Sequence, residues 1–497
     1  MASIRSHRPF PTLGSTALLI CATVFSAPVH ASGHPKDVKG TRIIRTITNS
    51  GETAAPQDLT STPISAFVPD GMGGFMTISG TGLANGTFTI PQVPKDEYWF
   101  RFGNSYVWTD EHKLDLDIFA YGRPDAVPAT LSTILTFNVT GLTPFAASDI
   151  LQWYATNVNS VYGYLGDFNP TNMPLAGDIA MVGTAQDWVD TGLLLVDATK
   201  GDEPSLTQLS SVSSGAETYS VLTGIFKPAS LVQLDGLPTT LNGALTPVPQ
   251  HEDVRIAWDR TPYATYQAQV NPTATPSFQR FVVHTPPWGT NKGFIAATAD
   301  LVNFYPSSLA TTSLDLGEAH YGNPFPHRWG QVYSINQNYS VSYIAPGATH
   351  PRPIQATLST NSLKEPKRHH PMLQAIGPVI SPMINGSDAF VSQSGLTASP
   401  SIAWSRPTQG EADAYSVAVL RIFAQGVSTR TTTVASLITE ETSLTVPPGI
   451  LQPGQSYIFR IRAIKAKDAE PSKAPFRLNT FPFATADALT AMVTVAP

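Results

Sequence analysis

The stretch Leu451-Gln452-Pro453-Gly454-Gln455-Ser456-Tyr457, followed by Phe459-Arg460-Ile461-Arg462-Ala463, decides how the end of this 497-residue chain folds. Pro453-Gly454 is a turn dipeptide. The residues that follow alternate between apolar and polar, which is typical of a strand with one buried face. This stretch therefore predicts a tight turn that leads into a strand, with Tyr457 at the start of the strand.

Residues upstream of this turn supply more short strands. Residues 400–404 form an early strand that ends in Trp404, and residues 414–419 place alternate apolar residues on one face. Leu444 and Val446 belong to another short strand. Together with the L-x-P-G-x-x-Y element, this pattern resembles a fibronectin type III domain over residues 377–497.

The resemblance carries specific structural expectations. In such domains the corner tyrosine bonds back to the backbone and fixes the connection between the two sheets, so Tyr457 is expected to do so here. Leu451 would pack beneath the corner, and Trp404 would fill the centre of the sandwich.

The composition indicates short strands and turns throughout the chain. Charged residues make up 13%, while 43 prolines and 36 glycines interrupt the sequence. The net charge is −6, and no basic stripe with interleaved aromatics is present, which disfavours nucleic acid as a partner. We predict an all-β chain of tandem β-sandwich domains, the C-terminal one fibronectin type III-like.

The first 31 residues have the features of a Sec signal peptide. Arg5 and Arg8 precede the apolar run 16–26, which is too short to span a bilayer, and Ala31 closes a V-H-A cleavage site. Lipidation at Cys21 is the alternative, although the large Ile20 before it disfavours that modification. Either route predicts a secreted, periplasmic or cell-surface protein, and no later segment is long enough to be membrane-spanning.

Cys21 is the only cysteine. A mature chain without it contains no disulfide, no thiolate zinc site and no cysteine nucleophile. Its stability must then come from buried apolar area, for which the chain is long enough.

The first module is expected at residues 41–125. Residues 86–91 and 98–102 both alternate, and a short proline-flanked turn separates them, so a hairpin is predicted. The pattern G-x-F-x-I-x-x-V-P-x-x-x-Y, from Gly86 to Tyr98, resembles prealbumin-like or carboxypeptidase-regulatory-like modules over residues 64–107. That resemblance implies a small sandwich acting as a spacer or binding platform, and no catalysis.

The middle of the chain is expected to form two β-rich domains, 126–271 and 272–375, followed by the last domain at 377–497. Recurring turn signals suit sandwiches or a small propeller-like array of sheets, and we favour sandwiches. The run 193–196 fits a strand buried on both faces, and 361–372 is typical of a polar linker. The segment order resembles uncharacterised secreted bacterial proteins at residues 122–125, at residues 321–326 and in the closing domain, a family with no activity to transfer.

Paired carboxylates are the first candidate chemistry, because a glycosidase needs two of them across a cleft. Asp115 and Asp117 alternate with apolar residues and are expected on a solvent-exposed strand face. Further acids flank an aromatic or a histidine, namely Asp187 and Asp190 around Trp188, and Asp315 and Glu318 near His320. We assign no catalytic residues, because no pair can be placed opposite another. Serine chemistry is not predicted either, since no G-x-S-x-G motif is present.

Metal and cofactor sites are likewise not predicted. His320 and His327 lie seven residues apart, a spacing that matches no ligand frame. His369 and His370 sit in the basic linker, and residues 197–203 lack the alternating oxygen ligands of a calcium loop. We therefore expect no metal and no cofactor.

Tryptophans are the remaining hint of binding. Core packing is the default for each of them, but an exposed one could stack on a sugar or peptide, and Trp288 in a proline-rich loop is the candidate. The set is Trp99, Trp108, Trp153, Trp188, Trp258, Trp288 and Trp329.

Two hypotheses follow. The first is a non-enzymatic extracellular protein, a rod of β-sandwiches serving in adhesion, as a scaffold, or in binding a glycan or protein ligand. The second is a secreted hydrolase with carbohydrate as its candidate substrate, in which the middle region is catalytic and the fibronectin-like domain accessory. Two acids across a lined cleft, one with a raised pKa, would favour the second hypothesis.

Overall fold

In the computed structural model of this chain, residues 34–158, 162–293, 299–364 and 370–497 are described. The expected signal peptide, Cys21 and His369 lie outside these ranges. Strands dominate the described part, and its one α-helix is α1 (Tyr263–Val270), so the predicted all-β class is confirmed. Within the same ranges, no helix has the length and apolar character needed to cross a bilayer.

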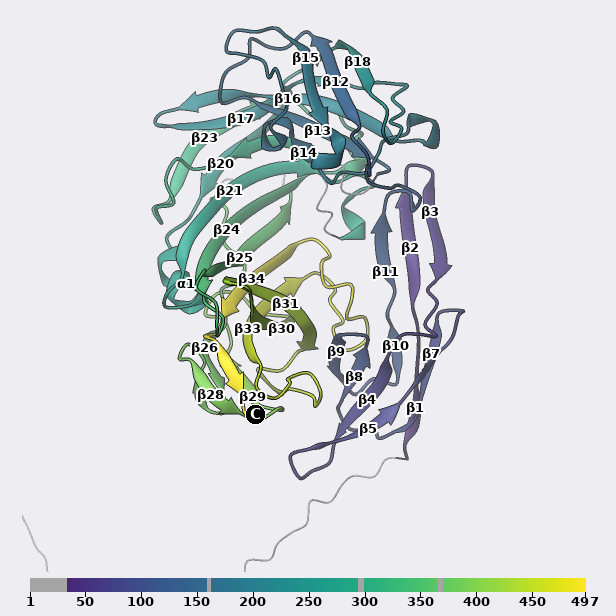
Figure 1. The fold of residues 1–497 in the computed structure, drawn as a ribbon. Helices are drawn as coiled ribbons and strands as arrows, with labels where there is room; N and C mark the ends of the chain where they lie inside the picture. The colour runs from purple at the N-terminus through teal and green to yellow at the C-terminus, as the bar shows by residue number, and fades with distance from the viewer. Residues whose placement is uncertain (1–33, 159–161, 294–298, 365–369) are drawn as a thin grey trace, which may run out of the picture.

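The first unit (34–122) contains a sandwich of two sheets (Figure 1). One sheet has the order β10 (Lys113–Asp115), β1 (Lys36–Thr41), β7 (Thr87–Val93), β6 (Thr81–Gly82). The facing strands are β9 (Ser105–Thr109), β8 (Tyr98–Phe102), β4 (Ile64–Pro69) and β5 (Phe75–Ser79), in that order.

The predicted hairpin between residues 86–91 and 98–102 is wrong. β7 pairs with β1 and β6, whereas β8 pairs with β9 and β4. The two alternating strands lie in opposite sheets and meet through their apolar faces, where Phe88 stacks on Phe100 with ring centroids 5.3 Å apart. Alternation marks a buried face, but it does not say whether two such strands pair by their edges or pack by their faces.

A three-stranded arm extends from this sandwich. It consists of β11 (Ile118–Tyr121), β2 (Ile43–Thr48) and β3 (Gly51–Pro56). Figure 1 shows the arm running from the sandwich towards the second unit. Asn49 stands at its tip, in the turn between β2 and β3.

The second unit (126–248) packs two sheets around the buried Trp153 and Trp188. One sheet contains β15 (Ala180–Asp187), β12 (Ile134–Thr140) and β18 (Thr239–Ala244). The other contains β14 (Tyr162–Tyr164), β13 (Ile150–Thr156), β16 (Glu203–Ser214) and β17 (Glu217–Phe226). Residues 193–196 do not form the predicted strand; they are a largely buried irregular segment with a single bridge from Leu194 to Pro128.

The third unit (252–363) has one large sheet, covered by a strand pair and by α1. The sheet has the order β22 (Ala299–Phe304), β21 (Thr275–Thr285), β24 (Val332–Tyr343), β25 (Arg352–Leu363). The strand pair is β20 (Glu252–Trp258) and β23 (Leu314–Tyr321). The expected boundary near Pro272 falls between α1 and β21, and β20 before it pairs with β23 after it.

The fourth unit (372–497) is the fibronectin-like module. One sheet has the order β27 (Ser387–Asp388), β26 (Ile380–Ile384), β29 (Ser401–Ser405), β32 (Ser443–Thr445). The other has β31 (Ser428–Thr439), β30 (Ala414–Gln425), β33 (Ser456–Ala466) and then β34 (Phe483–Leu489), with β28 (Gln393–Leu396) beside β35 (Val493–Val495).

The tyrosine corner of this module forms as expected. The backbone N–H of Gln452 donates to the hydroxyl of the fully buried Tyr457 across 2.8 Å. Trp404 is buried and meets the Tyr415 ring edge-on at 5.3 Å. Leu451 is buried as well.

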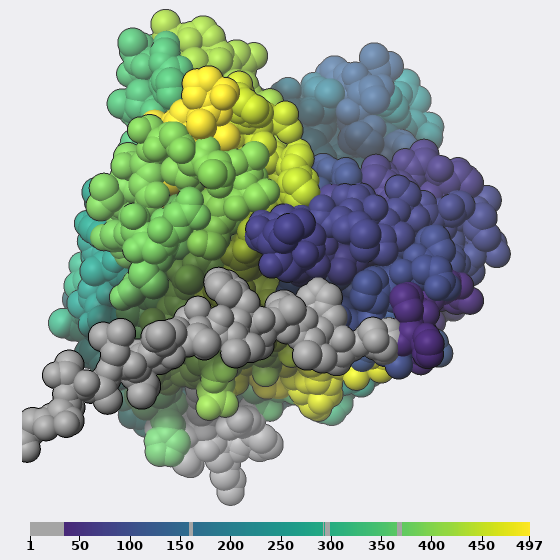
Figure 2. All heavy atoms as spheres, turned by 90° about the horizontal axis from the view of Figure 1, so that it is seen from below, coloured from purple at the N-terminus to yellow at the C-terminus, as the bar shows by residue number. Residues whose placement is uncertain are grey.

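Backbone pairing continues from each unit into another. β17 pairs with β22, β25 with β34, and β31 with β9, so one hydrogen-bonded ribbon of strands passes through all four units. Figure 2 shows the first unit packed against the fourth, at the opposite end of the sequence. The units therefore do not form the extended rod of the first hypothesis, because the first unit contacts both the second and the fourth.

The expected linker 361–372 is also only partly a linker. Asn361 is a buried residue of β25, and Met372 is buried and bonds through its backbone to Ala257 and Asp259. Its central residues 365–369 lie outside the described part.

Candidate functional site

A pocket of about 550 Å³ lies between the first unit and the fibronectin-like module. We call it the tryptophan pocket. Its lining comes from three parts of the first unit and, in the fibronectin-like module, from the start of β29 and the segment around β32. The lining residues are Pro69, Gly71, Gly73, Gly74, Phe75, Glu97, Trp99, Trp108, Ser401, Glu441, Ser443, Leu444 and Thr445.

Two tryptophans form one wall of this pocket. Trp99 of β8 and Trp108 of β9 are cross-strand partners, and their rings meet edge-on with centroids 5.3 Å apart. Trp99 is 1% exposed, and its indole N–H donates to the carbonyl of Thr445 across 3.1 Å. This bond fixes the wall against the fibronectin-like module, while the half-buried Trp108 presents ring surface to the pocket.

The turn between β4 and β5 forms a second wall. The Asp70 carboxylate accepts hydrogen bonds from the backbone N–H groups of Met72 and Gly74, each at 2.8 Å. These bonds lower the pKa of Asp70. Gly73 has a φ of +91°, a conformation that favours glycine. The loop is therefore held in shape by its own sequence.

Two carboxylates complete the lining. Glu97 lies just before β8, and Glu441 lies just before β32 in the fibronectin-like module. Partial burial and the negative charges of Glu441, Asp110 and Glu440 raise the pKa of Glu97, against a hydrogen bond from Trp108. The pocket thus combines an aromatic face with acceptor oxygens, which suits a ligand that carries hydroxyl or ammonium donors.

The sequence-predicted acids lie elsewhere. The expectation that Asp115 and Asp117 share a solvent-exposed face is wrong for Asp117, which is 4% exposed and accepts from the Ile43 backbone N–H and from Arg45. The chain changes partner from β1 to β2 between Asp115 and Ile118, and Asp117 lies in this gap, so the alternation breaks there. Asp115 instead binds Arg477 of the fibronectin-like module.

The acids around Trp188 do not form a sugar subsite. Trp188 is 1% exposed, and its indole donates to the carbonyl of Leu194. Asp187 accepts from the Ser132 hydroxyl and from the backbone N–H of Thr133, and these bonds lower its pKa. Both groups therefore serve the packing of the second unit.

The histidine candidates are not brought together. His320 pairs with Asp253 across β20 and β23, and Asp315 pairs with Arg255. His327 begins a short 3-10 turn (His327–Trp329) and is exposed, as is His370. Across the described ranges, no group of three histidine, cysteine or acidic side chains could hold a metal ion.

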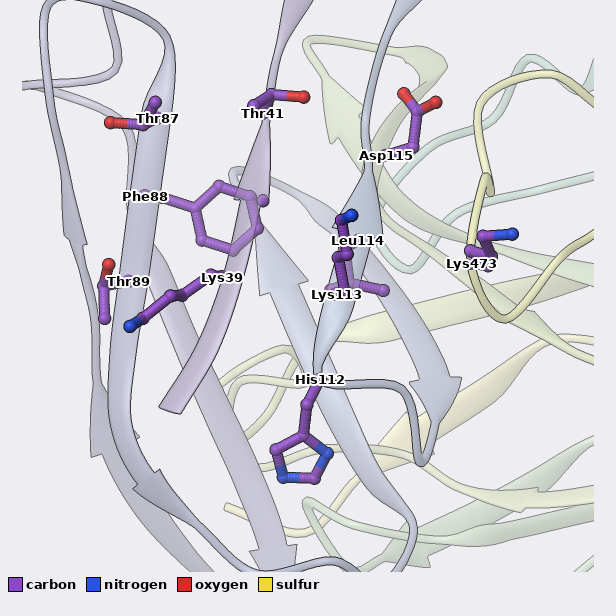
Figure 3. Close-up of a pocket in the computed structure, with 11 residues that line it drawn as sticks. Lys39, Thr41, Thr87, Phe88, Thr89, His112, Lys113, Leu114, Asp115 and Lys473 are labelled. Carbon is purple, nitrogen blue, oxygen red and sulfur yellow. The ribbon is translucent and has the colours of Figure 1, made fainter. Parts of the chain in front are cut away.

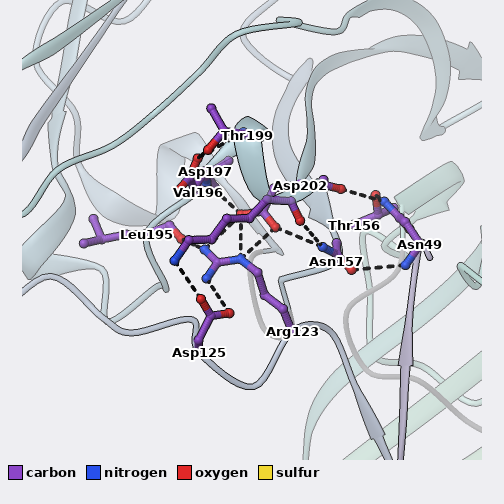
Figure 4. A network of polar contacts seen from close by, with 12 residues as sticks. Asn49, Arg123, Asp125, Thr156, Asn157, Leu195, Val196, Asp197, Thr199 and Asp202 are labelled. Atoms are coloured by element: carbon purple, nitrogen blue, oxygen red, sulfur yellow. Dashed lines mark hydrogen bonds and ion pairs between the residues drawn. The ribbon is translucent and has the colours of Figure 1, made fainter. Parts of the chain in front are cut away.

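The loop 197–203 fastens the second unit to residues 122–125. Asp202 is 3% exposed and accepts from Arg123 Nε at 2.9 Å, while Lys200 reaches Asp125 (Figure 4). Asp197 instead caps a short 3-10 turn through the Thr199 N–H. These residues hold the units together, which gives the sequence motif Gly122-Arg123-Pro124-Asp125 a structural role.

Trp288 is half-buried but is not an open stacking platform. Its ring stacks on Tyr121 of the arm with centroids 6.1 Å apart and an angle of 9° between the planes. Its indole N–H donates to Asn49. The residue therefore joins the arm to the third unit.

One buried polar group of the third unit was not anticipated. His284 Nε2 lies 2.8 Å from Ser334 Oγ, and Ser334 donates to the side-chain oxygen of Asn361 at 2.6 Å. Because the serine proton is directed to Asn361, Nε2 of His284 is left to donate to Ser334. This arrangement links β21, β24 and β25, and it does not prime Ser334 as a nucleophile.

Sequence reasoning did not identify Glu97 or Glu441 as site residues, and it did not separate Trp108, which lines the pocket, from the other tryptophans. The alternating run that begins at Tyr98 puts Trp99 on the face opposite Tyr98 and Phe100, so it gave no sign that Trp99 is buried as well. The proximity of Glu441 depends on the pairing of β9 with β31, for which the sequence carries no local sign.

Comparisons with known proteins leave the family open. No protein-family model matches the chain, and no curated protein matches it. Among solved structures, the chicken CNTN1 FN1-FN3 domains are 10% identical with a TM-score of 0.14, over 75% of this chain and 97% of that chain. So weak a superposition carries no argument. The class of this protein, tandem β-sandwiches with a fibronectin type III-like module at the end, rests on its own strand order and on Tyr457.

Proposed function

We propose that this chain is a secreted, non-enzymatic modular protein that binds an extracellular glycan in the tryptophan pocket. The observation that carries the proposal is Trp108, whose half-buried ring lines the pocket beside Glu97 and Glu441. Apolar ring faces stack on sugar rings, and carboxylates accept hydrogen bonds from sugar hydroxyls. The first unit would serve as the binding platform that its prealbumin-like pattern implies.

The pocket also has the supports that a binding site needs. Trp99 is anchored to Thr445, and the Asp70 turn is closed by two backbone hydrogen bonds. A site held in this way loses little conformational freedom when a ligand binds. Its lining comes from two units joined by strand pairing, so it needs both of them in place.

A glycan array on the purified chain tests the proposal. Trp108→Ala should weaken binding of any hit by about tenfold or more, because tryptophans at the centre of a site carry much of the binding energy. Phe278→Ala is the matched control, since it removes a partly exposed ring of the third unit, outside the pocket. Binding that survives Trp108→Ala unchanged, or no glycan bound at all, would contradict the proposal.

A hydrolase remains the second candidate, for one specific reason. Glu97 and Glu441 both line the pocket, and burial together with the Glu441 charge raises the pKa of Glu97. A pair of carboxyl groups, one of them with a raised pKa, is the arrangement used by glycosidases. Turnover of a bound polysaccharide that is lost in both Glu97→Gln and Glu441→Gln would establish this candidate over the first.

A further inference from the structure

A second hollow lies on the first unit, with a volume of about 760 Å³. We call it the lysine hollow. Its lining comes from β1, β7 and β10 and from Lys473 on a loop of the fibronectin-like module (Figure 3). None of its residues belongs to the tryptophan pocket. It is therefore a separate feature of the molecule.

Two lysines stand directly opposite each other in this hollow. Lys39 of β1 is the register partner of Lys113 on β10, and its partner on the other side is Thr89 of β7. Adjacent strands lie roughly 4.8 Å apart, and like charges directly opposite each other destabilise a sheet. Both lysines are exposed. The two residues are therefore neighbours across adjacent strands and both side chains are exposed, although the Lys39 side chain points towards Thr89 and away from Lys113 in Figure 3.

The nearby carboxylates do not neutralise this pair. Asp37 lies 3.5 Å from Lys39, in an exposed contact that solvent screens. Among the described residues, no carboxylate lies within ion-pair distance of Lys113. Asp115 lines the hollow, but it is held by Arg477 at 2.5 Å.

Lys473 adds a third ammonium group from the other unit. Its backbone carbonyl accepts from the Asp115 N–H at 2.9 Å, which fixes its loop against β10. Its side chain makes an exposed contact of 3.5 Å with Glu470. Hydroxyl groups complete the hollow, from Thr41 and Thr87 at one end and Thr89 nearer the lysines.

We propose that the lysine hollow binds a segment of an acidic glycan, with a carboxylate or sulfate group between Lys39 and Lys113. Both side chains are exposed and can turn towards a bound anion, which would then accept a charge-assisted hydrogen bond from each ammonium group. The volume is in the range of pockets that take extended small-molecule ligands, which favours an oligosaccharide over a free anion. The threonine hydroxyls would then bond the sugar hydroxyls.

Calorimetric titration of the full chain with oligogalacturonate, which carries carboxylates, tests this proposal. Binding should weaken as the ionic strength rises. The variant Lys39→Gln/Lys113→Gln should lose about fivefold or more in affinity, because it removes two charged donors. The matched control Lys95→Gln/Lys465→Gln removes the same charge from exposed lysines outside the hollow and should bind as before.

Three further ligands show which anionic group the hollow prefers and whether it needs an oligosaccharide. Preference for a heparin hexasaccharide over oligogalacturonate would identify sulfate as the preferred group and support the site. Equal binding of neutral maltohexaose would overturn the proposal, as would displacement of the oligosaccharide by stoichiometric inorganic phosphate. No binding of either acidic oligosaccharide, or unchanged binding by Lys39→Gln/Lys113→Gln, would also overturn it.

A stability measurement distinguishes this site from lysines that only support the fold. Lys113→Gln should raise the unfolding temperature of the free chain at low salt, since it removes a like-charge neighbour of Lys39. The same variant should reduce the rise in unfolding temperature caused by oligogalacturonate. A lysine with a purely structural role would lower the stability of the free chain instead.

Discussion

The indole N–H of Trp288 donates to the side-chain oxygen of Asn49 across 3.0 Å, and the two residues are 239 positions apart in the sequence. Asn49 also donates to the Thr156 hydroxyl and to the Gly201 carbonyl, each at 3.0 Å. One residue at the tip of the arm therefore contacts both the second and the third unit. These contacts join the first unit to the middle of the chain.

Asn49→Ala should loosen this joint. The substitution removes the partner of Trp288 and two side-chain donor bonds, and we expect a loss of about 1–3 kcal/mol in unfolding free energy. Hydrogen exchange in the arm (43–56) should become faster while exchange in the β33 core stays unchanged. Ser50→Ala, at the neighbouring residue whose hydroxyl bonds to Thr48 of the same arm, is the control. Equal exchange in both variants would contradict this role.

Asp202→Asn should lower the unfolding free energy more than Asn49→Ala does. The carboxylate is 3% exposed and accepts hydrogen bonds from Nε and Nη2 of Arg123, from the side-chain amide of Asn157 and, at 2.7 Å, from the Asp197 N–H. Within the described ranges, the variant leaves Arg123 with only the exposed Asp125 as counter-ion, so the loss should approach the roughly 3–5 kcal/mol that is typical of a broken buried ion pair. Urea unfolding of the variant measures the loss.

Asp125→Asn is the internal comparison for that experiment. Its carboxylate also contacts Arg123, but the side chain is 53% exposed. Exposed ion pairs contribute about 1 kcal/mol or less. If the two variants lose equal stability, burial is not what makes Asp202 important.

Tyr457→Phe tests the tyrosine corner. The substitution keeps the ring and removes the acceptor of the Gln452 N–H, so a loss of about 1–2 kcal/mol is expected. Tyr305→Phe, at a ring that is 38% exposed, should change the unfolding free energy little. A corner variant as stable as the parent would show that the turn is held by packing alone.

The corner was predictable because its determinants are local. A Pro-Gly turn, an alternating strand and a tyrosine at a fixed spacing all lie within residues 451–463. The arrangement of Phe88 against Phe100 was not predictable in the same way, because alternation is equally compatible with pairing in one sheet and packing between two. The structure differs from the prediction where the choice depended on partners distant in the sequence.

The same reason explains what was missed at the site. Trp99 and Trp108 come close through the short hairpin of β8 and β9, which was not predicted, and Glu441 reaches them only because β31 pairs with β9. Asp117 alternates with apolar neighbours and still turns inward, because the chain changes partner strand beside it. Pairing between units leaves no periodic signal in either strand.

His284 should make the chain sensitive to mild acid. Burial, with a smaller contribution from the Arg280 charge, lowers its pKa to about 3. The unfolded chain then binds one more proton than the folded chain between about pH 6.5 and pH 3, so stability falls as the pH decreases through that range. The slope from this residue is at most about 1.4 kcal/mol per pH unit.

Urea unfolding between pH 7 and pH 4 measures that slope. His284→Gln keeps a side-chain donor for Ser334 but does not titrate, so its stability should depend less on pH than that of the parent. The carboxylates of both chains contribute equally and cancel in the comparison. Parallel pH profiles would show that His284 is not the residue responsible.

Glu97 should have the opposite dependence on pH. Partial burial and then the Glu441 charge raise its pKa, so the folded state disfavours the ionised carboxylate. This destabilisation is absent below the pKa that Glu97 has in the unfolded chain. It develops as the pH rises through the higher pKa that Glu97 has in the folded chain. Glu97→Gln should therefore stabilise the chain at pH 7 and have little effect at pH 3.5.

A double-mutant cycle identifies what causes the gain in stability of Glu97→Gln at pH 7. If the charge of Glu441 contributes to it, Glu441→Gln should stabilise the parent at pH 7 more than it stabilises the Glu97→Gln variant. At pH 3.5 Glu97 is protonated because its pKa is raised, and the difference should disappear. Additive effects at pH 7 would mean that the two groups do not interact across the tryptophan pocket, and the hydrolase candidate would lose the observation on which it rests.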